Sequence, residues 1–448
     1  MNTKDNLSTT RRTFIKSTAL AAGGLMTMPL ASNAGYFTSV DDAIKVAVIG
    51  CGGRGTGAAM QALLSKQNVK LVAMADAFRD RIDECYNALM SDDISEAGVS
   101  GNLKNKIAVK EDTKFVGFDA YMKAIPLADV VILATPPGFR PIHFEEAIKQ
   151  GKHVFMEKPV ATDPAGVKKV LDTAAIAKQK KLNVVVGLQR HYQNSYLELY
   201  KRLKDGMIGE ITSAQAWWNN DGVWVKMREP GMTEMEYQMR NWYYFNWLCG
   251  DHITEQHIHN IDVVNWFKGS YPVKAQGMGG RQVRTGKEYG EIFDHHYVEY
   301  HYADGSILNS QCRHIKGTYA IVDEMIVGTK GVIKCGAGEI TNGGKTLYKF
   351  DKKGENNPYQ TEHDELFAAV AKREYKYADA ENGAKATLTS ILGRMATYSG
   401  QVMEWDKVLN SGISIMPAKF AFDAEPPVKP DANGFYPIAT PGVTKYPA

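Results

Sequence analysis

The segment from residue 44 to residue 55 restricts the fold of this 448-residue chain more than any other part of it. Ile44 to Ile49 is a short, nearly continuous apolar run, as expected for a parallel strand that is covered on both faces. It leads directly into Gly50-Cys51-Gly52-Gly53-Arg54-Gly55, a G-x-G-x-x-G pattern. Glycines with this spacing permit a tight turn and let the N-terminus of the next helix approach a pyrophosphate. The segment therefore predicts a dinucleotide-binding unit.

An acidic residue follows at the position that selects the nucleotide. Residues 69–75 read as a second strand, which ends at Asp76, 21 residues after Gly55. A carboxylate there accepts hydrogen bonds from the adenine-side ribose hydroxyls and repels a 2′-phosphate. The sequence therefore favours NAD over NADP, although Arg79 and Arg81 leave NADP open as the second choice.

Three more buried-strand runs follow, with a helical segment at residues 143–149 between the first two, and each run ends in polar or proline residues. The runs are residues 129–134, ending at Thr135-Pro136-Pro137; 153–156, ending at Glu157-Lys158-Pro159; and 183–188, ending at Gln189-Arg190-His191. Alternating strands and helices predict a doubly wound parallel sheet with its ligand at the carboxyl ends of the strands. We assign residues 43–188 to this NAD-binding Rossmann domain.

The pattern changes after Ile211. Short strand-like runs separated by turns predict a largely antiparallel sheet with one face on helices; they are residues 211–218, 273–277, 293–302, 306–311, 320–327 and 331–335. We assign residues 189–380 to this substrate and oligomerisation domain. A helix is expected from Glu381 to Trp405, within a segment 381–410 that packs back on the Rossmann domain, and 411–448 is expected to be an extended tail.

Composition excludes several classes of protein. The 53 basic and 50 acidic residues leave a net charge of only +3, so no basic footprint for nucleic acid is indicated. The five cysteines form no C-x-x-C pair, and we interpret them as buried free thiols. After the N-terminal region, no run approaches about 18 consecutive apolar residues, so no membrane span is expected in the mature protein.

The first 34 residues are typical of an export signal. Arg11-Arg12-Thr13-Phe14-Ile15-Lys16 is followed by a short apolar run rich in small residues, and Ser32-Asn33-Ala34 supplies small residues for cleavage. This order resembles a twin-arginine signal, which directs folded proteins across a bacterial inner membrane. We therefore expect residues 1–34 to be a signal peptide and the protein to be periplasmic or otherwise exported. No free nicotinamide pool is expected there, so a dinucleotide enzyme would have to carry its cofactor with it.

Lys158 is the first candidate for catalysis. It ends a strand beside the expected nicotinamide, where an ammonium can bind a substrate hydroxyl and relay its proton. An exposed lysine at the start of a loop is the alternative.

The second candidate group is Asp251-His252-Ile253-Thr254-Glu255-Gln256-His257-Ile258-His259-Asn260-Ile261-Asp262. On one continuous helix Glu255 and His259 share a face, and so do Glu255 and Asp262, which indicates a general acid/base histidine oriented by a carboxylate. A metal site made from His252, Glu255, His257 and His259, or a helix cap with core histidines, are the competing interpretations.

Five of the seven tryptophans lie between residues 217 and 247, among tyrosines and polar residues. Aromatic faces beside hydroxyl-binding groups suit a sugar. A core cluster or a subunit interface is the competing interpretation.

These motifs together resemble the Gfo/Idh/MocA oxidoreductases, over about residues 45–409. The motifs are Gly50-x-Gly52-x-x-Gly55, Asp76, Thr135-Pro136-Pro137, Glu157-Lys158-Pro159 and the late carboxylate/histidine segment. The resemblance implies an α/β fold: an N-terminal Rossmann doubly wound parallel sheet, and a C-terminal α/β domain with a large, mostly antiparallel open sheet that often forms the interface of a homo-oligomer. It also implies NAD(P)-dependent oxidation or reduction of sugars, inositols or their relatives.

By the same resemblance Lys158 is the catalytic lysine. Glu255 and His259 take the family's Asp-x-x-x-His positions, with Glu in place of Asp and His257 in place of the usual glycine. The leader adds similarity to two exported branches. Glucose–fructose oxidoreductase cycles a bound cofactor between two sugars, and NAD-dependent glycosidases cleave a glycosidic bond through transient oxidation at C3. Both branches stay open, as does a non-catalytic sugar- or nucleotide-binding protein.

We therefore expect hydride transfer between a tightly held NAD and a sugar or glycoside hydroxyl carbon. Lys158, His259 and Glu255 are expected to be catalytic. The cofactor is expected to contact Gly50, Gly52, Gly53, Arg54, Gly55, Asp76, Thr135, Pro136, Pro137, His143, Glu157, Lys158 and Gln189, and the substrate to contact Arg190, Trp242, His257 and His259. No metal ligand is expected.

Overall fold

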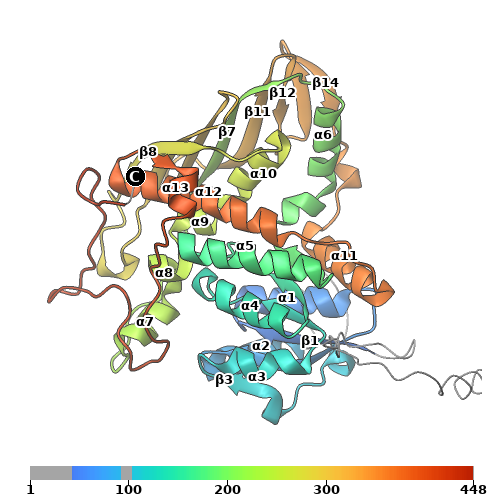
Figure 1. Ribbon diagram of the computed structural model, residues 1–448, viewed down its shortest axis with the longest axis vertical. Helices are drawn as coiled ribbons and strands as arrows, with labels where there is room; N and C mark the ends of the chain where they lie inside the picture. The colour runs from blue at the N-terminus through green and yellow to red at the C-terminus, as the bar shows by residue number, and fades with distance from the viewer. Residues whose placement is uncertain (1–42, 92–102, 447–448) are drawn as a thin grey trace, which may run out of the picture. The chain divides into compact units, whose positions relative to one another are not determined.

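The computed structural model of the chain describes residues 43–91 and 103–446 (Figure 1). The export signal expected at residues 1–34 lies outside the described residues. None of the helices in the described ranges is both long enough and apolar enough to cross a bilayer.

The first layer is a six-stranded, all-parallel sheet in the order β3-β2-β1-β4-β5-β6, which is the order of a Rossmann fold. Its strands are β1 (Ile44–Ile49), β2 (Val69–Asp76), β3 (Lys114–Val116), β4 (Val130–Leu133), β5 (His153–Met156) and β6 (Val184–Val186). The predicted parallel sheet is confirmed, with strands shorter than the apolar runs. The weakly apolar β3 was not predicted.

Helices cover both faces of this sheet, which explains why its strands are apolar throughout. Alternate residues of β1 enter different cores. Ala47 and Ile49 pack toward α3 (Ala120–Ala124), α4 (Arg140–Lys149) and α5 (Pro164–Gln179). Val46 and Val48 pack toward α1 (Gly53–Leu64), α2 (Arg79–Leu89) and α11 (Pro358–Lys372). Through α11, a late segment of the chain completes the Rossmann layer.

The second layer is a nine-stranded sheet in the order β14-β13-β12-β11-β7-β10-β9-β8-β15, and only the pairing of β7 with β10 is parallel. Its strands are β7 (Ile211–Asn220), β8 (Lys274–Gly280), β9 (His295–His301), β10 (Ile307–His314), β11 (Ile321–Gly328), β12 (Gly331–Lys334), β13 (Glu339–Asn342), β14 (Lys345–Lys349) and β15 (Met403–Glu404). All six predicted strands are present, so the mostly antiparallel sheet is confirmed. The polar strand β13 and the polar edge strand β14 were missed, because they lack the apolar alternation that marks a half-buried strand.

Helices α10 (Ile258–Lys268) and α12 (Ala380–Ser399) contact this second sheet, and α12 also packs against α5 of the Rossmann layer (Figure 1). α12 is shorter than the helix that was predicted to run from Glu381 to Trp405. It ends at Gly400, which takes a left-handed conformation (φ 68°), and α13 (Trp405–Leu409) is a separate helix.

The tail from residue 411 to residue 446 contains no helix or strand and runs along the body of the protein, as expected for an extended segment. Its half-buried Phe420 and Phe422 contact aromatic residues of the Rossmann layer. The five cysteines are buried free thiols, as the sequence indicated.

Candidate active site

The glycine-rich turn has the geometry of a phosphate cradle. A Cβ atom on Gly50 would lie 2.4 Å from the Thr135 amide nitrogen, and one on Gly55 would lie 1.8 Å from the Gly50 carbonyl oxygen. These two glycines let the turn pack against β4. Gly52 and Gly53, in contrast, have open space where a Cβ would be. No side chain caps the N-terminus of α1 and no acidic residue lies in its first turn, so its amide groups fit a pyrophosphate.

Asp76 stands beside this cradle. Its carboxylate accepts hydrogen bonds from the Cys51 amide (2.7 Å) and the Phe78 amide (3.0 Å), which leaves lone pairs for ribose hydroxyls. Burial raises the pKa of Asp76, and the two amides oppose that effect. Arg79 pairs with Asp83 and Glu111, and Arg81 pairs with Asp80 and Glu84. Because both arginines are engaged with acids, the site fits NAD.

A cavity extends from Asp76 along the carboxyl ends of β1, β2 and β4. Thr135, Pro136 and His143, which were predicted to contact the cofactor, line it, whereas Pro137 is not among the lining residues and is buried at the start of a short 3-10 turn. Burial and the nearby Arg140 lower the pKa of His143 to about 3, so this ring is neutral. Phe118 and Phe139 also line the cavity.

The catalytic candidates meet at the end of β5. Lys158 Nζ donates to the Glu255 carbonyl oxygen (2.6 Å) and lies 3.3 Å from Glu255 Oε1. Both side chains are nearly buried, and Glu255 Oε2 has no hydrogen-bond partner within the described part of the chain. The bond between Lys158 and Pro159 is cis. Burial raises the pKa of Glu255, against the opposing charge of Lys158.

The expected single helix through Glu255 and His259 is wrong. α9 (His252–Glu255) ends before α10 begins at Ile258. The His259 amide donates its hydrogen bond to the Gln256 carbonyl oxygen, whereas in a continuous helix it would donate to the Glu255 carbonyl oxygen. The break leaves the Glu255 carbonyl oxygen free to accept Lys158 Nζ. Glu255 therefore pairs with Lys158, and this contact replaces the predicted contact between Glu255 and His259.

His259 is buried near Trp218, with ring centroids 6.0 Å apart, and its Nδ1 has no hydrogen-bond partner. Burial lowers its pKa well below the usual range, and the charges of Lys158 and Arg190 lower it further. A neutral imidazole whose pKa is lowered by burial and by the charge of Lys158 can accept a proton from a bound hydroxyl.

A charged network connects the cradle to this centre. Arg54 Nε lies 2.5 Å from Glu157 Oε1, and the guanidinium also reaches the buried Glu362 at 3.3 Å. Gly187 leaves room for Glu157, because a Cβ there would lie 2.7 Å from Glu157 Oε2. Arg54 and Glu157 thus support the cofactor turn, while Glu362 on α11 was not predicted because no motif marks it.

A second cavity opens between the two layers, beside α11. Gln189, Arg190, Tyr196 and Tyr359 line it, and its volume is about 520 Å³. The side-chain amide of Gln189 donates to the Tyr359 hydroxyl (3.1 Å), and Arg190 pairs with the fully buried Glu324. Glu324 also accepts from Asn260 (2.6 Å), the neighbour of His259 in the chain. This wall of polar groups suits a ligand with several hydroxyls.

Two residues that were predicted to contact the substrate, His257 and Trp242, line neither of these cavities. His257 is fully buried, with Nε2 2.7 Å from Ser310 Oγ on β10, because the helix break turns it toward the sheet. Trp242 packs edge-on against Trp224 in a separate aromatic core that also contains Trp247. The core interpretation therefore holds for Trp247 and Trp242, whereas Trp224 is 43% exposed and Trp218 lies beside His259.

Comparison with known proteins agrees with this geometry. Residues 44–188 match the model of an oxidoreductase family with an NAD-binding Rossmann fold, GFO/IDH/MocA, and residues 196–334 match the C-terminal domain of the same family. A 2,7-anhydro-N-acetylneuraminate hydratase from Escherichia coli is 27% identical over 235 residues, which are 50% of this chain and 56% of that enzyme. An inositol 2-dehydrogenase from Gluconacetobacter diazotrophicus is 30% identical over 171 residues, 38% of this chain and 44% of that enzyme.

Among solved structures, the myo-inositol dehydrogenase of Lactobacillus casei, in complex with NAD(H) and myo-inositol, has the same fold. The TM-score is 0.57 at 20% identity, over 81% of this chain and 97% of that one.

Proposed function

We propose that this chain, which belongs to the Gfo/Idh/MocA family of NAD-binding oxidoreductases, exchanges hydride with the carbon of a CH–OH group in a sugar or cyclic polyol. The observation that carries the proposal is the contact of Lys158 Nζ with Glu255 at the carboxyl end of β5, close enough to His259 for the lysine charge to lower the pKa of that imidazole, and beside a cradle that fits NAD. Relatives of this chain named as inositol 2-dehydrogenases support the substrate class.

The side chains divide the proton chemistry between them. Two of the three Lys158 donors have Glu255 oxygens within reach, so the third is available for the substrate hydroxyl. The buried Glu255 keeps the ammonium in place, and neutral His259 accepts the hydroxyl proton. NAD, when bound, supplies the hydride acceptor. The polar wall at Arg190 orients the remaining hydroxyls.

Activity of a lysine variant tests this assignment. Lys158→Ala should abolish oxidation of a panel of inositols and aldoses while the variant still binds NAD, since Lys158 lies outside the glycine cradle. Lys149→Ala, an exposed lysine of the same domain, is the control and should keep full activity. Unchanged turnover in Lys158→Ala would refute the role of this residue.

A retained cofactor is part of the proposal. The tail residues Phe420 and Phe422 pack on Phe118 and Phe139, the aromatic wall of the cavity next to Asp76. A strap over this cavity slows the escape of a bound dinucleotide. Nucleotide released by denaturing the purified protein should be close to one NAD or NADH per chain, and an empty protein would contradict retention.

A redox-neutral reaction is the second candidate, because an enzyme that keeps its cofactor must restore it in each turnover. Similarity to the E. coli hydratase supports this alternative. In that reaction Lys158 and His259 would serve first the oxidation of a glycoside and then the return of hydride. Product analysis with glycosides and no added nucleotide distinguishes the two: cleavage supports the second candidate, and its absence together with sugar oxidation supports the first.

Export and assembly complete the proposal. The twin-arginine segment at Arg11 and Arg12 would direct the folded holoprotein to the periplasm, and replacing both arginines by lysine should hold it in the cytoplasm. The outer face of the nine-stranded sheet would join copies of the chain. Light scattering should then give a mass larger than one chain, and a monomer would refute this interface.

A further inference from the structure

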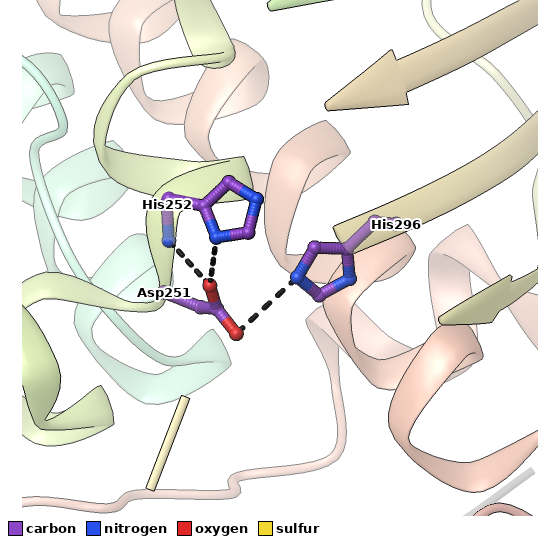
Figure 2. Close-up of side chains that lie close together, drawn as sticks. All are labelled: Asp251, His252 and His296. Atoms are coloured by element: carbon purple, nitrogen blue, oxygen red, sulfur yellow. Dashed lines mark hydrogen bonds and ion pairs between the residues drawn. The ribbon is translucent and has the colours of Figure 1, made fainter. Parts of the chain in front are cut away.

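A second group of titratable side chains lies at the start of α9, whereas Glu255, which contacts Lys158, ends this helix. Asp251 and His252 precede and begin α9, and His296 comes from β9; Figure 2 shows both imidazoles turned toward the carboxylate. Asp251 and His252 are fully buried and His296 is 3% exposed. One nitrogen or oxygen atom from each residue lies within 4.8 Å of the others.

Three of the four ring nitrogens in this group, both of His252 and Nε2 of His296, lack hydrogen-bond partners among the described residues. His252 Nδ1 is 2.8 Å from Asp251 Oδ1, and His296 Nε2 is 3.3 Å from Asp251 Oδ2, yet neither has the alignment of a hydrogen bond. His252 Nε2 is also buried without a partner. Burying an imidazole nitrogen without a partner is costly, so a missing ligand is indicated.

The hydrogen bond of the other His296 ring nitrogen, Nδ1, also indicates a missing ligand at Nε2. The Thr397 hydroxyl donates to the Arg394 carbonyl oxygen (2.9 Å), so its oxygen accepts His296 Nδ1–H at 2.9 Å. In the neutral ring, Nε2 then carries a lone pair that faces the Asp251 carboxylate. These two electron-rich groups repel each other unless a cation lies between them. Metal-binding histidines commonly donate their second nitrogen in this manner.

Asp251 retains room for one more partner. Its carboxylate accepts hydrogen bonds from the amides of His252 (2.5 Å) and Phe293 (3.0 Å) and from the Tyr398 hydroxyl (2.5 Å). A carboxylate has about four lone-pair sites, so one stays free.

We propose that Asp251, His252 and His296 bind a divalent transition-metal ion of the zinc class. Two imidazole nitrogens with one carboxylate oxygen form a ligand set that suits zinc and its neighbours, whereas calcium and magnesium prefer oxygen ligands alone. Bonds of about 2.0–2.1 Å at tetrahedral angles place ligand atoms about 3.4 Å apart. The three atoms, now within 4.8 Å, reach that spacing by rotation of the side chains.

The metal would position the catalytic lysine indirectly. The Glu255 amide donates a hydrogen bond to the Asp251 carbonyl oxygen (2.9 Å), and the Glu255 carbonyl oxygen accepts one from Lys158 Nζ. An ion that joins Asp251 and His252 to β9 would therefore fix the start of the short helix α9. The metal site itself does not depend on the proposed hydride transfer.

Metal content of the purified holoprotein tests the proposal. Protein from cells supplied with zinc should contain about one zinc ion per chain after dialysis. His296→Asn should lose it. His295→Asn is the matched control, because this neighbouring side chain on β9 is 39% exposed and points to the other side of the strand. Zinc that persists in His296→Asn, or is lost equally from both variants, would overturn the assignment.

A second measurement needs no variant. Wild-type protein stripped with a chelator and titrated with Co²⁺ should develop the visible absorption of a low-coordinate cobalt site with nitrogen and oxygen ligands. A wild-type protein that binds neither zinc nor cobalt would show that a proton, rather than a metal, joins His296 to Asp251. Both readouts are independent of turnover, so a failed metal site and a failed hydride assignment are distinguishable.

Discussion

Replacing Phe422 by leucine should accelerate the release of NAD. The Phe422 ring lies 4.8 Å from the ring of Phe118 and 5.2 Å from that of Phe78, measured between centroids. Phe118 lines the cavity beside Asp76, so in the proposed retention of the cofactor the tail braces this wall and its release precedes the loss of the nucleotide.

The magnitude follows from the two aromatic contacts. Each such pair contributes about 0.5–1.5 kcal/mol beyond the apolar area it buries. Leucine keeps most of the apolar area but loses both pairs, a cost of about 1–3 kcal/mol. Because about 1.4 kcal/mol corresponds to a tenfold change, NAD should dissociate about 5–150 times faster.

The assay follows nucleotide retained by the holoprotein during repeated ultrafiltration, with mass spectrometry of the denatured protein at each time. Phe435→Leu provides the control, since Phe435 lies in the same tail, is 44% exposed and contacts Lys287. Equal retention in Phe422→Leu, Phe435→Leu and wild type would refute the strap, and rapid loss from all three would refute retention itself.

Three further predictions concern the cofactor turn and a buried acid. Gly55→Ala should weaken NAD binding by about tenfold or more, because its Cβ would lie 1.8 Å from the Gly50 carbonyl oxygen. Gly57→Ala, whose Cβ would make an ordinary 3.5 Å contact, is the calorimetric control, and equal affinities would contradict the cradle. Asp76→Asn should reduce the preference for NAD over NADP by about tenfold, and an unchanged ratio of dissociation constants would remove Asp76 from nucleotide selection. Burial raises the pKa of Glu324 from 4.5 to about 7, against the charge of Arg190. The folded state therefore holds this proton more tightly, and the free energy of unfolding should fall as the pH rises from 4.5 to about 7, by on the order of 3 kcal/mol. Urea unfolding of Glu324→Gln should lack this fall in the free energy of unfolding between pH 4.5 and about 7. The same pH dependence in both proteins would show that Glu324 is not its source.

The Rossmann half could be predicted in detail because its determinants are local. The apolar run of β1, the turn at Gly50 and the acid at Asp76 follow one another within 33 residues, from position 44 to position 76. Strand type, turn geometry and nucleotide preference each depend on neighbours in the chain. The polar strands β13 and β14 escaped prediction because pairing, of β13 with β12 and of β14 with β13, and not their own composition, makes them strands.

The candidate site shows where such reasoning ends. Lys158 was identified from its place after a strand, yet its partner could not be, because the break between α9 and α10 frees the Glu255 carbonyl oxygen. The pattern of the segment is compatible with a continuous helix. Only packing against the nine-stranded sheet, where His257 meets Ser310, selects the broken one.

By itself, the sequence determined the layer architecture, the NAD cradle and the residue types available for proton transfer, since these follow from spacing along the chain. The tertiary structure decided which of those residues meet. It brought His296 to Asp251 across 45 positions and packed Phe422 of the tail against Phe118, which lines the cavity beside Asp76. Contacts between distant segments depend on the packing of whole layers, and no local pattern records them.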